Sequence, residues 1–229
     1  MKAFFITGTD TEIGKTAITA GLTHLAATAG LRSLAVKPVA AGQDCINGQW
    51  INDDVQRLLA ATPLPLNAQQ VGPLQLRTAC APHVAAQLEG VTIARPALLH
   101  AVQQTLALGE LGFVEGVGGF RVPLTPDWDT ADLACDLGLP VILVVGLRLG
   151  CINHALLTAE AIQSRGLKLA GWVANTVDPN LPHANANLQA LANGLQAPCW
   201  GHVPRLAEPS AAAVAACLDG NALREAMNR

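Results

Sequence analysis

A glycine-bounded segment near the N-terminus constrains this chain more than any other feature. It reads Gly8-Thr9-Asp10-Thr11-Glu12-Ile13-Gly14-Lys15-Thr16, and it lies between a short apolar run and a helical pattern. Between a strand and a helix, such a loop directs backbone N–H groups and the positive helix end toward an anion. The lysine adds a full charge, and the threonine hydroxyl can ligate Mg²⁺. The segment therefore predicts a site for ATP or GTP with Mg²⁺. The alternative is an ordinary strand–helix turn, but such turns rarely end in Gly-Lys-Thr.

One detail of the loop distinguishes it from the commonest form. The usual pattern has about four residues between the first glycine and Gly-Lys-[Ser/Thr], whereas this loop has one more, from Thr9 to Ile13.

The composition argues against several classes of partner. The chain has 229 residues, a net charge of -3 and no basic run, which disfavours nucleic acid and anionic membranes. Aromatic residues make up 3% with no tyrosine, so no stacking platform for single-stranded nucleic acid is visible. The longest apolar run, 139–147, is far shorter than the roughly 20 residues that span a bilayer. The N-terminal run is too short for a signal peptide, so we expect a cytoplasmic protein.

The cysteines do not predict a metal site or a disulfide framework. The six form no CxxC pair and no Cys/His metal spacing, and in an α/β chain of this size we expect reduced core residues. They are Cys45, Cys80, Cys135, Cys151, Cys199 and Cys217.

Short apolar runs alternate with helical patterns along the chain. The predicted strands are 3–7, 33–37, 112–115, 141–145, 169–174 and 198–202. The predicted helices are 15–29, 53–61, 82–88, 96–108, 131–137, 153–164, 184–193 and 211–218. Several strands are apolar throughout, which is typical of strands covered on both faces. We therefore expect an α/β fold: one domain over residues 1–229, with a doubly wound, mostly parallel sheet and helices on both faces.

Polar residues follow several of these strands, where ligands bind in such folds. Lys37 ends one strand, and its compact charge suits a developing anion, although a surface lysine is the plain alternative. A predicted helix opens with Asn52-Asp53-Asp54. Helix capping alone would explain one of the two acids and leave the other for Mg²⁺, so a capping role and a Mg²⁺-binding role are evenly balanced here. Glu115 ends a buried strand before Gly116-Val117-Gly118-Gly119, so Mg²⁺ ligation fits it and the glycines permit close approach of a ligand.

Two further strand ends carry candidate ligand-binding groups. The stretch 146–154 opens a helix whose free N–H groups can take a carboxylate. A nucleophilic pair of Cys151 and His154 is disfavoured, because no third orienting group is evident. Asn175 follows another strand and can pair with a base edge through its amide; a turn-forming asparagine is an equal alternative.

Together these motifs resemble dethiobiotin synthetase, the ATP-dependent carboxylase that closes the ureido ring in biotin synthesis. The resemblance covers residues 3 to about 208 and rests on these segments: Gly8 to Thr16, Lys37-Pro38-Val39-Ala40, Asn52-Asp53-Asp54, Val114 to Gly119, Pro140 to Gly146, Gly150-Cys151-Ile152-Asn153-His154 and Gly171-Trp172-Val173-Ala174-Asn175.

The resemblance implies a reaction and a set of site residues. The substrates are 7,8-diaminononanoate, CO₂ and ATP, and the reaction passes through a carbamate and a carbamic-phosphoric mixed anhydride. Lys37, Lys15 and Thr11 are the implied catalytic residues, and Mg²⁺ is held by Thr16, Asp54 and Glu115. Nucleotide contacts fall on Glu12, Ile13, Gly14, Lys15, Thr16, Ala17, Asp54, Glu115, Gly116, Val117, Gly118, Asn175, Thr176, Pro204, Arg205 and Leu206. Substrate contacts fall on Thr11, Lys37, Ala41, Gly118, Gly150, Cys151 and Asn153. A homodimer is implied, with the substrate carboxylate bound across the interface by the Gly150-to-Asn153 helix start of the neighbouring subunit.

Two positions depart from the family pattern. Ala41 stands where many members have a serine that hydrogen-bonds the substrate, and losing one neutral hydrogen bond costs about 0.5–1.5 kcal/mol. Ala81, in Cys80-Ala81-Pro82-His83, stands where a serine often precedes the Pro-His pair.

Two other functions are consistent with a phosphate loop. An amide-forming synthetase of the cobyrinate type usually carries a glutaminase domain, for which there is no room after Glu208. An ATP switch of the partitioning or septum-positioning kind typically has a second lysine early in the loop, where this chain has Thr9, Asp10 and Thr11.

Overall fold

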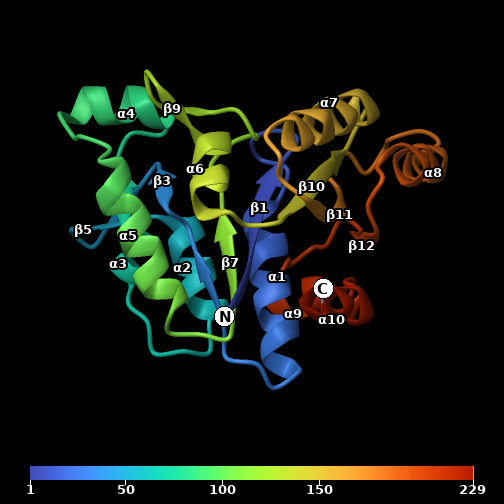
Figure 1. Ribbon diagram of the computed structural model, residues 1–229, viewed down its shortest axis with the longest axis horizontal. Coiled ribbons are helices and arrows are strands. Elements are labelled where there is room, and N and C mark those ends of the chain that lie inside the picture. Colours follow the sequence, from blue (N-terminus) through green and yellow to red (C-terminus); the bar gives the residue numbers. More distant parts are fainter. Residues whose placement is uncertain (229) are drawn as a thin grey trace.

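The centre of the molecule is a parallel sheet. The computed structural model describes residues 1–228, and in this part of the chain six strands form the sheet in the order β12-β11-β10-β1-β7-β2 (Figure 1). Every neighbouring pair is parallel. The strands are β1 (Lys2–Gly8), β2 (Ser33–Val36), β7 (Leu111–Glu115), β10 (Val141–Leu147), β11 (Leu169–Thr176) and β12 (Cys199–Val203). All six match the predicted strands to within a few residues, and the predicted fold class is confirmed.

Helices cover both faces of this sheet. One core contains side chains of α5 (Arg95–Leu106), α6 (Thr130–Leu137) and α7 (Cys151–Ser164). The other contains side chains of α1 (Lys15–Thr28), α9 (Ala211–Ala215) and α10 (Gly220–Asn228). Along β1, Phe5 faces the first core while Phe4 and Ile6 face the second, because side chains alternate across a strand. The strand is buried on both sides, which explains the uninterrupted apolar run at residues 3–6.

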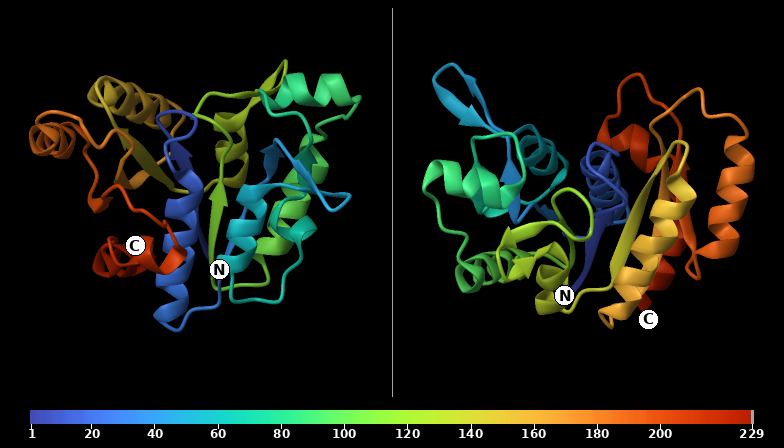
Figure 2. Two further views of the ribbon diagram at one scale, coloured as in Figure 1. Left: turned by 180° about the vertical axis from the view of Figure 1, so that it is seen from behind. Right: turned by 90° about the horizontal axis from the view of Figure 1, so that it is seen from above.

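The remaining elements surround this framework. They are the helices α2 (Asp53–Ala61), α3 (Ala68–Val71), α4 (Pro82–Glu89) and α8 (Ala184–Gly194), and the short strands β3 (Val39–Ala41), β4 (Asp44–Ile46), β5 (Gln49–Ile51), β6 (Leu74–Leu76), β8 (Pro123–Thr125) and β9 (Trp128–Asp129). The hairpin of β4 and β5 projects from the body (Figure 2) and turns at Asn47 and Gly48, whose φ angles are 52° and 79°. Asparagine and glycine tolerate this left-handed backbone, so the turn follows from the sequence.

Three expectations about the ends of helices are wrong. Helix α7 begins at Cys151, two residues before the predicted start at Asn153, because Gly150 adopts a left-handed φ of 92° and caps it. Residues 107–108 and 216–218, predicted as helix, lie beyond α5 and α9 respectively. The cysteine expectation holds in part: all six are free thiols within residues 1–228, but Cys45, Cys80 and Cys199 are exposed rather than in the core. No helix among the described residues is long and apolar enough to cross a membrane.

The topology directs attention to the carboxyl end of β1. Strands β7 and β2 lie on one side of β1, and β10, β11 and β12 lie on the other. Ligands in open parallel sheets bind beyond the carboxyl ends of the strands, where the order of strands reverses. The phosphate-loop sequence follows β1 directly and therefore lies at this point.

Candidate active site

The loop between β1 and α1 is held in a strained, closely packed conformation. Glu12 and Gly14 have positive φ angles of 58° and 89°. A Cβ atom at Gly14 would lie 2.3 Å from Nδ2 of Asn175, so a glycine is required there on two grounds. The same Asn175 Nδ2 donates to the carbonyl of Ile13 at 2.8 Å. Helix α1 has no side-chain cap, which leaves its N-terminus open to an anion.

Lys15 is a buried cation within this loop. It is 6% exposed, and its ammonium donates to the carbonyl oxygen of Asp10 at 2.8 Å. Desolvation, aided by the nearby charge of Lys37, lowers the pKa of Lys15 from 10.5 to about 8. A phosphate group at the helix start would supply the anionic partner that this ammonium lacks.

Four polar side chains, three from helices or strands and one from the segment after β2, meet beside the loop. The Thr16 hydroxyl lies 2.8 Å from Asp54 Oδ1 and 2.7 Å from Glu115 Oε1, and its single proton serves one of them at a time. The Lys37 ammonium donates to Asp54 Oδ2 at 2.8 Å and to Glu115 Oε1 at 2.5 Å. The structure thus brings together side chains that are up to 99 positions apart in sequence.

Burial makes this cluster electrostatically strong. Lys37 is 4% exposed and Glu115 is fully buried. Desolvation opposes the charge on Lys37, but the carboxylates of Glu115 and Asp54 outweigh it and raise the pKa of Lys37. Desolvation likewise opposes the charge on Asp54, yet Lys37 holds the pKa of Asp54 below its usual range. Lys37 and Asp54 therefore stay charged at neutral pH.

The donor set at this cluster fits Mg²⁺. Buried Oε2 of Glu115 has no hydrogen-bond partner among the described residues, which leaves it available to a cation. No group of three or more His, Cys, Asp or Glu side chains in residues 1–228 could by itself hold a metal. Mg²⁺ in nucleotide sites typically takes one or two carboxylates and completes its shell with phosphates and water. Two carboxylates and one hydroxyl beside a phosphate loop match this pattern.

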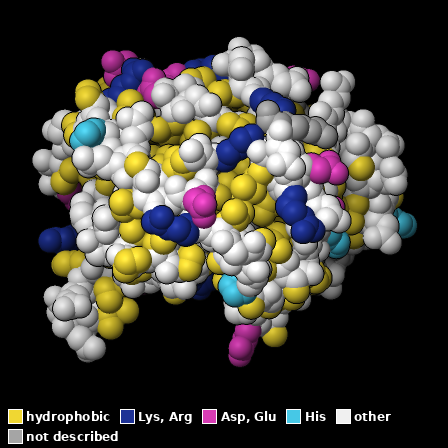
Figure 3. All heavy atoms as spheres, turned by 60° about the horizontal axis from the view of Figure 1, so that its bottom comes forward, with side chains coloured by type: hydrophobic (Ala, Val, Ile, Leu, Met, Phe, Trp, Pro, Cys, Tyr) yellow, Lys and Arg dark blue, Asp and Glu magenta, His cyan; other side chains and the backbone are white. Residues whose placement is uncertain are grey.

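A cavity of about 810 Å³ adjoins Lys15 and the cluster members Thr16, Lys37 and Asp54, whereas Glu115, Ile13 and Gly116 do not line it. It is lined by many predicted site residues: Thr11, Glu12, Gly14, Lys15, Thr16, Ala17, Lys37, Ala41, Asp54, Val117 and Gly118. A larger hollow of about 1100 Å³ lies at the opposite, amino end of the sheet, which Figure 3 brings forward. That hollow lacks the phosphate loop and the carboxylate cluster, so we place the chemistry in the smaller cavity.

The predicted residues near α7 lie outside this cavity. Cys151 is 1% exposed, and its backbone N–H donates to the carbonyl of Arg148 at 3.0 Å. Gly150 and Asn153 do not line the cavity either. Next to them, Leu149 is 86% exposed and Leu157 is 56% exposed.

The predicted base-binding residues lie at the ends of β11 and β12. The amide nitrogen of Asn175 is already engaged by the phosphate loop, as described above, and the Thr176 hydroxyl lies 2.9 Å from Nε2 of His202. Pro204, Arg205 and Leu206 follow β12 directly. These residues are therefore at the same edge of the sheet as the phosphate loop.

Sequence reasoning missed one ion pair at the loop. The guanidinium of Arg148 contacts the carboxylate of Asp10, whose other oxygen accepts the Thr11 backbone N–H at 2.8 Å. The bond from Thr11, with further help from Arg148, lowers the pKa of Asp10. Arg148 lies in the stretch 146–154, but nothing in the sequence pairs it with Asp10.

Comparisons with known proteins agree on the family. A family model described as an AAA domain matches residues 2–213. The chain is 53% identical to the ATP-dependent dethiobiotin synthetase BioD of Janthinobacterium sp. (strain Marseille), over 96% of this chain and 94% of the relative. It is 55% identical to the protein of the same name from Pseudomonas paraeruginosa, over 96% of each chain.

Solved structures show the fold at much lower identity. The MinD cell division protein of Aquifex aeolicus matches with a TM-score of 0.58 and 13% identity, over 100% of this chain and 98% of that one. A ParA family ATPase from Chlorobium tepidum matches with a TM-score of 0.56 and 12% identity, over 99% and 97%. At these identities the likeness concerns the fold alone.

Proposed function

This chain belongs to the ATP-dependent dethiobiotin synthetase family, and on that premise we propose that it converts 7,8-diaminononanoate, CO₂ and ATP into dethiobiotin, ADP and phosphate. The observation that carries the proposal is the cluster of Lys37, Thr16, Asp54 and Glu115 beside the phosphate loop. It concentrates positive charge and hard oxygen donors where a triphosphate and a carbamate would meet. We place this biosynthetic enzyme in the cytoplasm.

The first step forms a carbamate. One amine of the substrate attacks the carbon of CO₂, a new N–C bond forms, and the nitrogen loses a proton. The carbamate carries a negative charge that the site must hold. The ammonium of Lys37 stays charged at neutral pH because two carboxylates raise its pKa, so it is suited to stabilising this anion.

The second step transfers the phosphoryl group. A carbamate oxygen attacks the γ-phosphorus of ATP, the bond from phosphorus to ADP breaks, and a mixed anhydride results. Phosphoryl transfer needs positioning and charge neutralisation more than covalent help. Lys15 and the open N-terminus of α1 hold the phosphates, and Thr11 and Glu12 orient the reactants from the loop.

Mg²⁺ would be held by Thr16, Asp54 and Glu115. Bound there, the ion supplies neutralisation of the phosphate charge.

The third step closes the ring. The second amine attacks the carbamate carbon, the bond from that carbon to the phosphate oxygen breaks, and the nitrogen loses a proton. The attack is intramolecular, and well-aligned reactions of this kind reach effective molarities of about 10⁵–10⁸ M. The cavity is lined in part by Ala41, Val117 and Gly118. We assign Ala41 and Gly118 to substrate binding. We assign Gly116, Val117 and Gly118 to the phosphate end of the nucleotide.

The nucleotide base would lie at the ends of β11 and β12. The side-chain N–H of Asn175 donates a hydrogen bond to the carbonyl oxygen of Ile13. The amide oxygen of Asn175 is therefore the group that would accept a hydrogen bond from the adenine amine. We assign Thr176, Pro204, Arg205 and Leu206 to the walls of the same site, with Ile13, Gly14 and Ala17 below the phosphates.

A homodimer would complete the substrate site. Gly150, Cys151 and Asn153 lie outside the cavity of their own chain, and α7 has no side-chain cap. Its N-terminus can therefore bind the carboxylate of a substrate molecule that lies in the cavity of the neighbouring subunit. The exposed Leu149 and Leu157 beside it are suited to burial in such an interface.

Oxygen isotopes test the mechanism. With C¹⁸O₂ as substrate, the atom balance above puts one ¹⁸O in the released phosphate and leaves the other in the ring carbonyl. The reaction is sampled within seconds, before exchange with water, and the phosphate is analysed by mass spectrometry. Phosphate without ¹⁸O, formed together with dethiobiotin, would contradict the mixed anhydride.

A further inference from the structure

The loop after β7 lies directly against the phosphate loop. Gly118 has a φ of 65°, and a Cβ atom there would lie 2.9 Å from Cγ2 of Val122 and 3.5 Å from the Thr11 hydroxyl. A Cβ atom at Gly119 would lie 3.7 Å from the carbonyl of Gly8. Val122 and Gly118 also line the 810 Å³ cavity. A small displacement of this loop would therefore change the shape of the cavity.

One buried side chain fastens the loop from behind. Thr130 is 1% exposed. Its hydroxyl donates to the carbonyl of Phe120 at 2.6 Å and accepts the backbone N–H of Val122 at 3.0 Å. Its own backbone N–H donates to the carbonyl of Val122 at 3.0 Å. The backbone N–H and the backbone carbonyl of Val122 are thus both hydrogen-bonded to Thr130.

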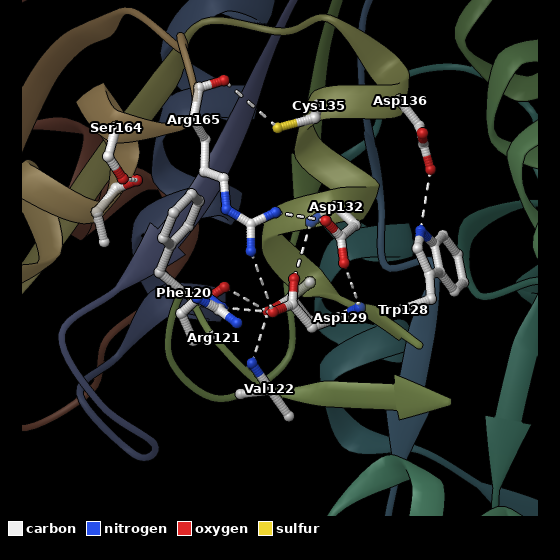
Figure 4. A network of polar contacts seen from close by, with 12 residues as sticks. Phe120, Arg121, Val122, Trp128, Asp129, Asp132, Cys135, Asp136, Ser164 and Arg165 are labelled. Carbon is white, nitrogen blue, oxygen red and sulfur yellow. Dashed lines mark hydrogen bonds and ion pairs between the residues drawn. The ribbon is translucent and has the colours of Figure 1, made fainter. Parts of the chain in front are cut away.

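An ionic network around Asp129 and Asp132 holds the start of α6, the helix that begins at Thr130, and Figure 4 shows this network. Asp129 caps α6 in a reciprocal pair with Asp132: the Asp132 N–H donates to Asp129 at 2.9 Å, and the Asp129 N–H donates to Asp132 at 3.0 Å. The Asp129 carboxylate also contacts the guanidinium of Arg121, which belongs to the loop. Arg165, at the end of α7, contacts Asp132 and lies 3.8 Å from Asp129. The start of α6, the loop and the end of α7 are therefore tied to one carboxylate pair.

We propose that Thr130 is a positioning residue that sets the 118–122 loop against the phosphate loop and so sets the affinity for the diamine. This inference rests on the proposed function. Thr130 acts through Gly118 and Val122, which face the cavity, and not by touching the substrate. The triphosphate is held mainly by Lys15 and the start of α1, which Thr130 does not contact, so we expect ATP binding to depend on Thr130 less than diamine binding does.

The test is Thr130→Val, which keeps the shape and removes both bonds of the hydroxyl. We expect the KM for 7,8-diaminononanoate to rise about three- to tenfold, as for the loss of one or two hydrogen bonds. The ATP Kd, measured by calorimetry without diamine, should change by a smaller factor than the diamine KM does. Thr130→Ser, which retains the hydroxyl, should restore the KM.

A matched control separates positioning from stability. Thr62 is 7% exposed, and its hydroxyl accepts the Ala35 N–H at 3.3 Å and donates to the carbonyl of Leu58 at 2.9 Å, away from the cavity. Thr62→Val loses an equivalent pair of bonds and should leave the diamine KM unchanged. If Thr130→Val does not fold, Arg121→Gln replaces it, because Arg121 is 61% exposed and its loss loosens the same loop; a KM rise of about twofold is then expected.

The outcomes distinguish this inference from the proposed function. Wild-type protein that makes no dethiobiotin overturns the proposed function. Wild-type protein that makes dethiobiotin, with an unchanged diamine KM in folded Thr130→Val, or in Arg121→Gln if that replaces it, overturns the inference alone. A rise that Thr62→Val shares equally also overturns it, because stability would then be the cause.

Discussion

Replacing Lys15 by methionine should stabilise the nucleotide-free protein at neutral pH. Burial lowers the pKa of Lys15 from 10.5 to about 8. This shift corresponds to a penalty of about 3 kcal/mol for keeping the ammonium charged at pH 7. Methionine fills a similar volume without the charge. It loses the hydrogen bond to the Asp10 carbonyl, and this loss cancels about 1.5 kcal/mol of the gained stability. The net gain is about 1–2 kcal/mol, and Tm should rise by about 2–8 °C.

The dependence on pH identifies the cause of this gain. Below about pH 8 Lys15 is charged in both the folded and the unfolded protein, so the penalty is fully present. Between about pH 8 and 10.5 the unfolded chain binds more protons than the folded one, and the wild type gains stability relative to Lys15→Met. Above 10.5 the advantage of the variant disappears.

Urea unfolding of both proteins at pH 7 and at pH 10 measures this difference. A variant that is less stable than the wild type at pH 7 would refute the reasoning, as would a gain that is the same at both pH values. The same variant should fail to bind ATP, because the charge that destabilises the free protein is the one that attracts the phosphates.

Three further substitutions test other parts of the site. Lys37→Gln leaves the fully buried Glu115 without its counter-charge. We expect the free energy of unfolding in urea to fall by about 3–5 kcal/mol, and turnover to be lost while ATP binding is retained. Wild-type stability of this variant would contradict the assignment of Lys37 as the counter-charge of Glu115. Ala41→Ser restores a hydroxyl in the cavity and should lower the diamine KM about three- to tenfold in steady-state kinetics; an unchanged KM would mean that another group serves there. Gly14→Ala should weaken ATP binding at least about tenfold in calorimetry, because its Cβ would lie 2.3 Å from a side-chain nitrogen of β11. Gly30→Ala, with a similar φ of 87° but open space around it, is its control, and equal effects of the two would contradict the steric argument.

The sheet could be predicted because its strands carry a strong local signal. β10 is apolar throughout, β1 contains the apolar run 3–6, and a helical pattern follows each of them. The short strands gave no such signal: β3 and β6 have three residues each, and their pairing depends on the rest of the fold. The early start of α7 depends on the left-handed backbone of Gly150, which periodicity does not reveal.

The candidate site was predictable where residues follow strands. Lys37 directly follows β2 and Glu115 ends the neighbouring β7, so the parallel topology alone brings them to one edge. The Asp10–Arg148 pair and the role of Thr130 were not predictable in the same way. Their partners are far away in sequence or are backbone groups, and only the folded chain shows which groups meet.

One measurement tests the central claim most directly. Purified protein is incubated with ATP, Mg²⁺, ¹³C-bicarbonate and 7,8-diaminononanoate, and the product is analysed by mass spectrometry while ADP is counted. We expect ¹³C-labelled dethiobiotin with one ADP for each molecule formed. ATP turnover that continues without the diamine, and yields no labelled product, would contradict the claim that this chain is a carboxylating, ring-closing ligase.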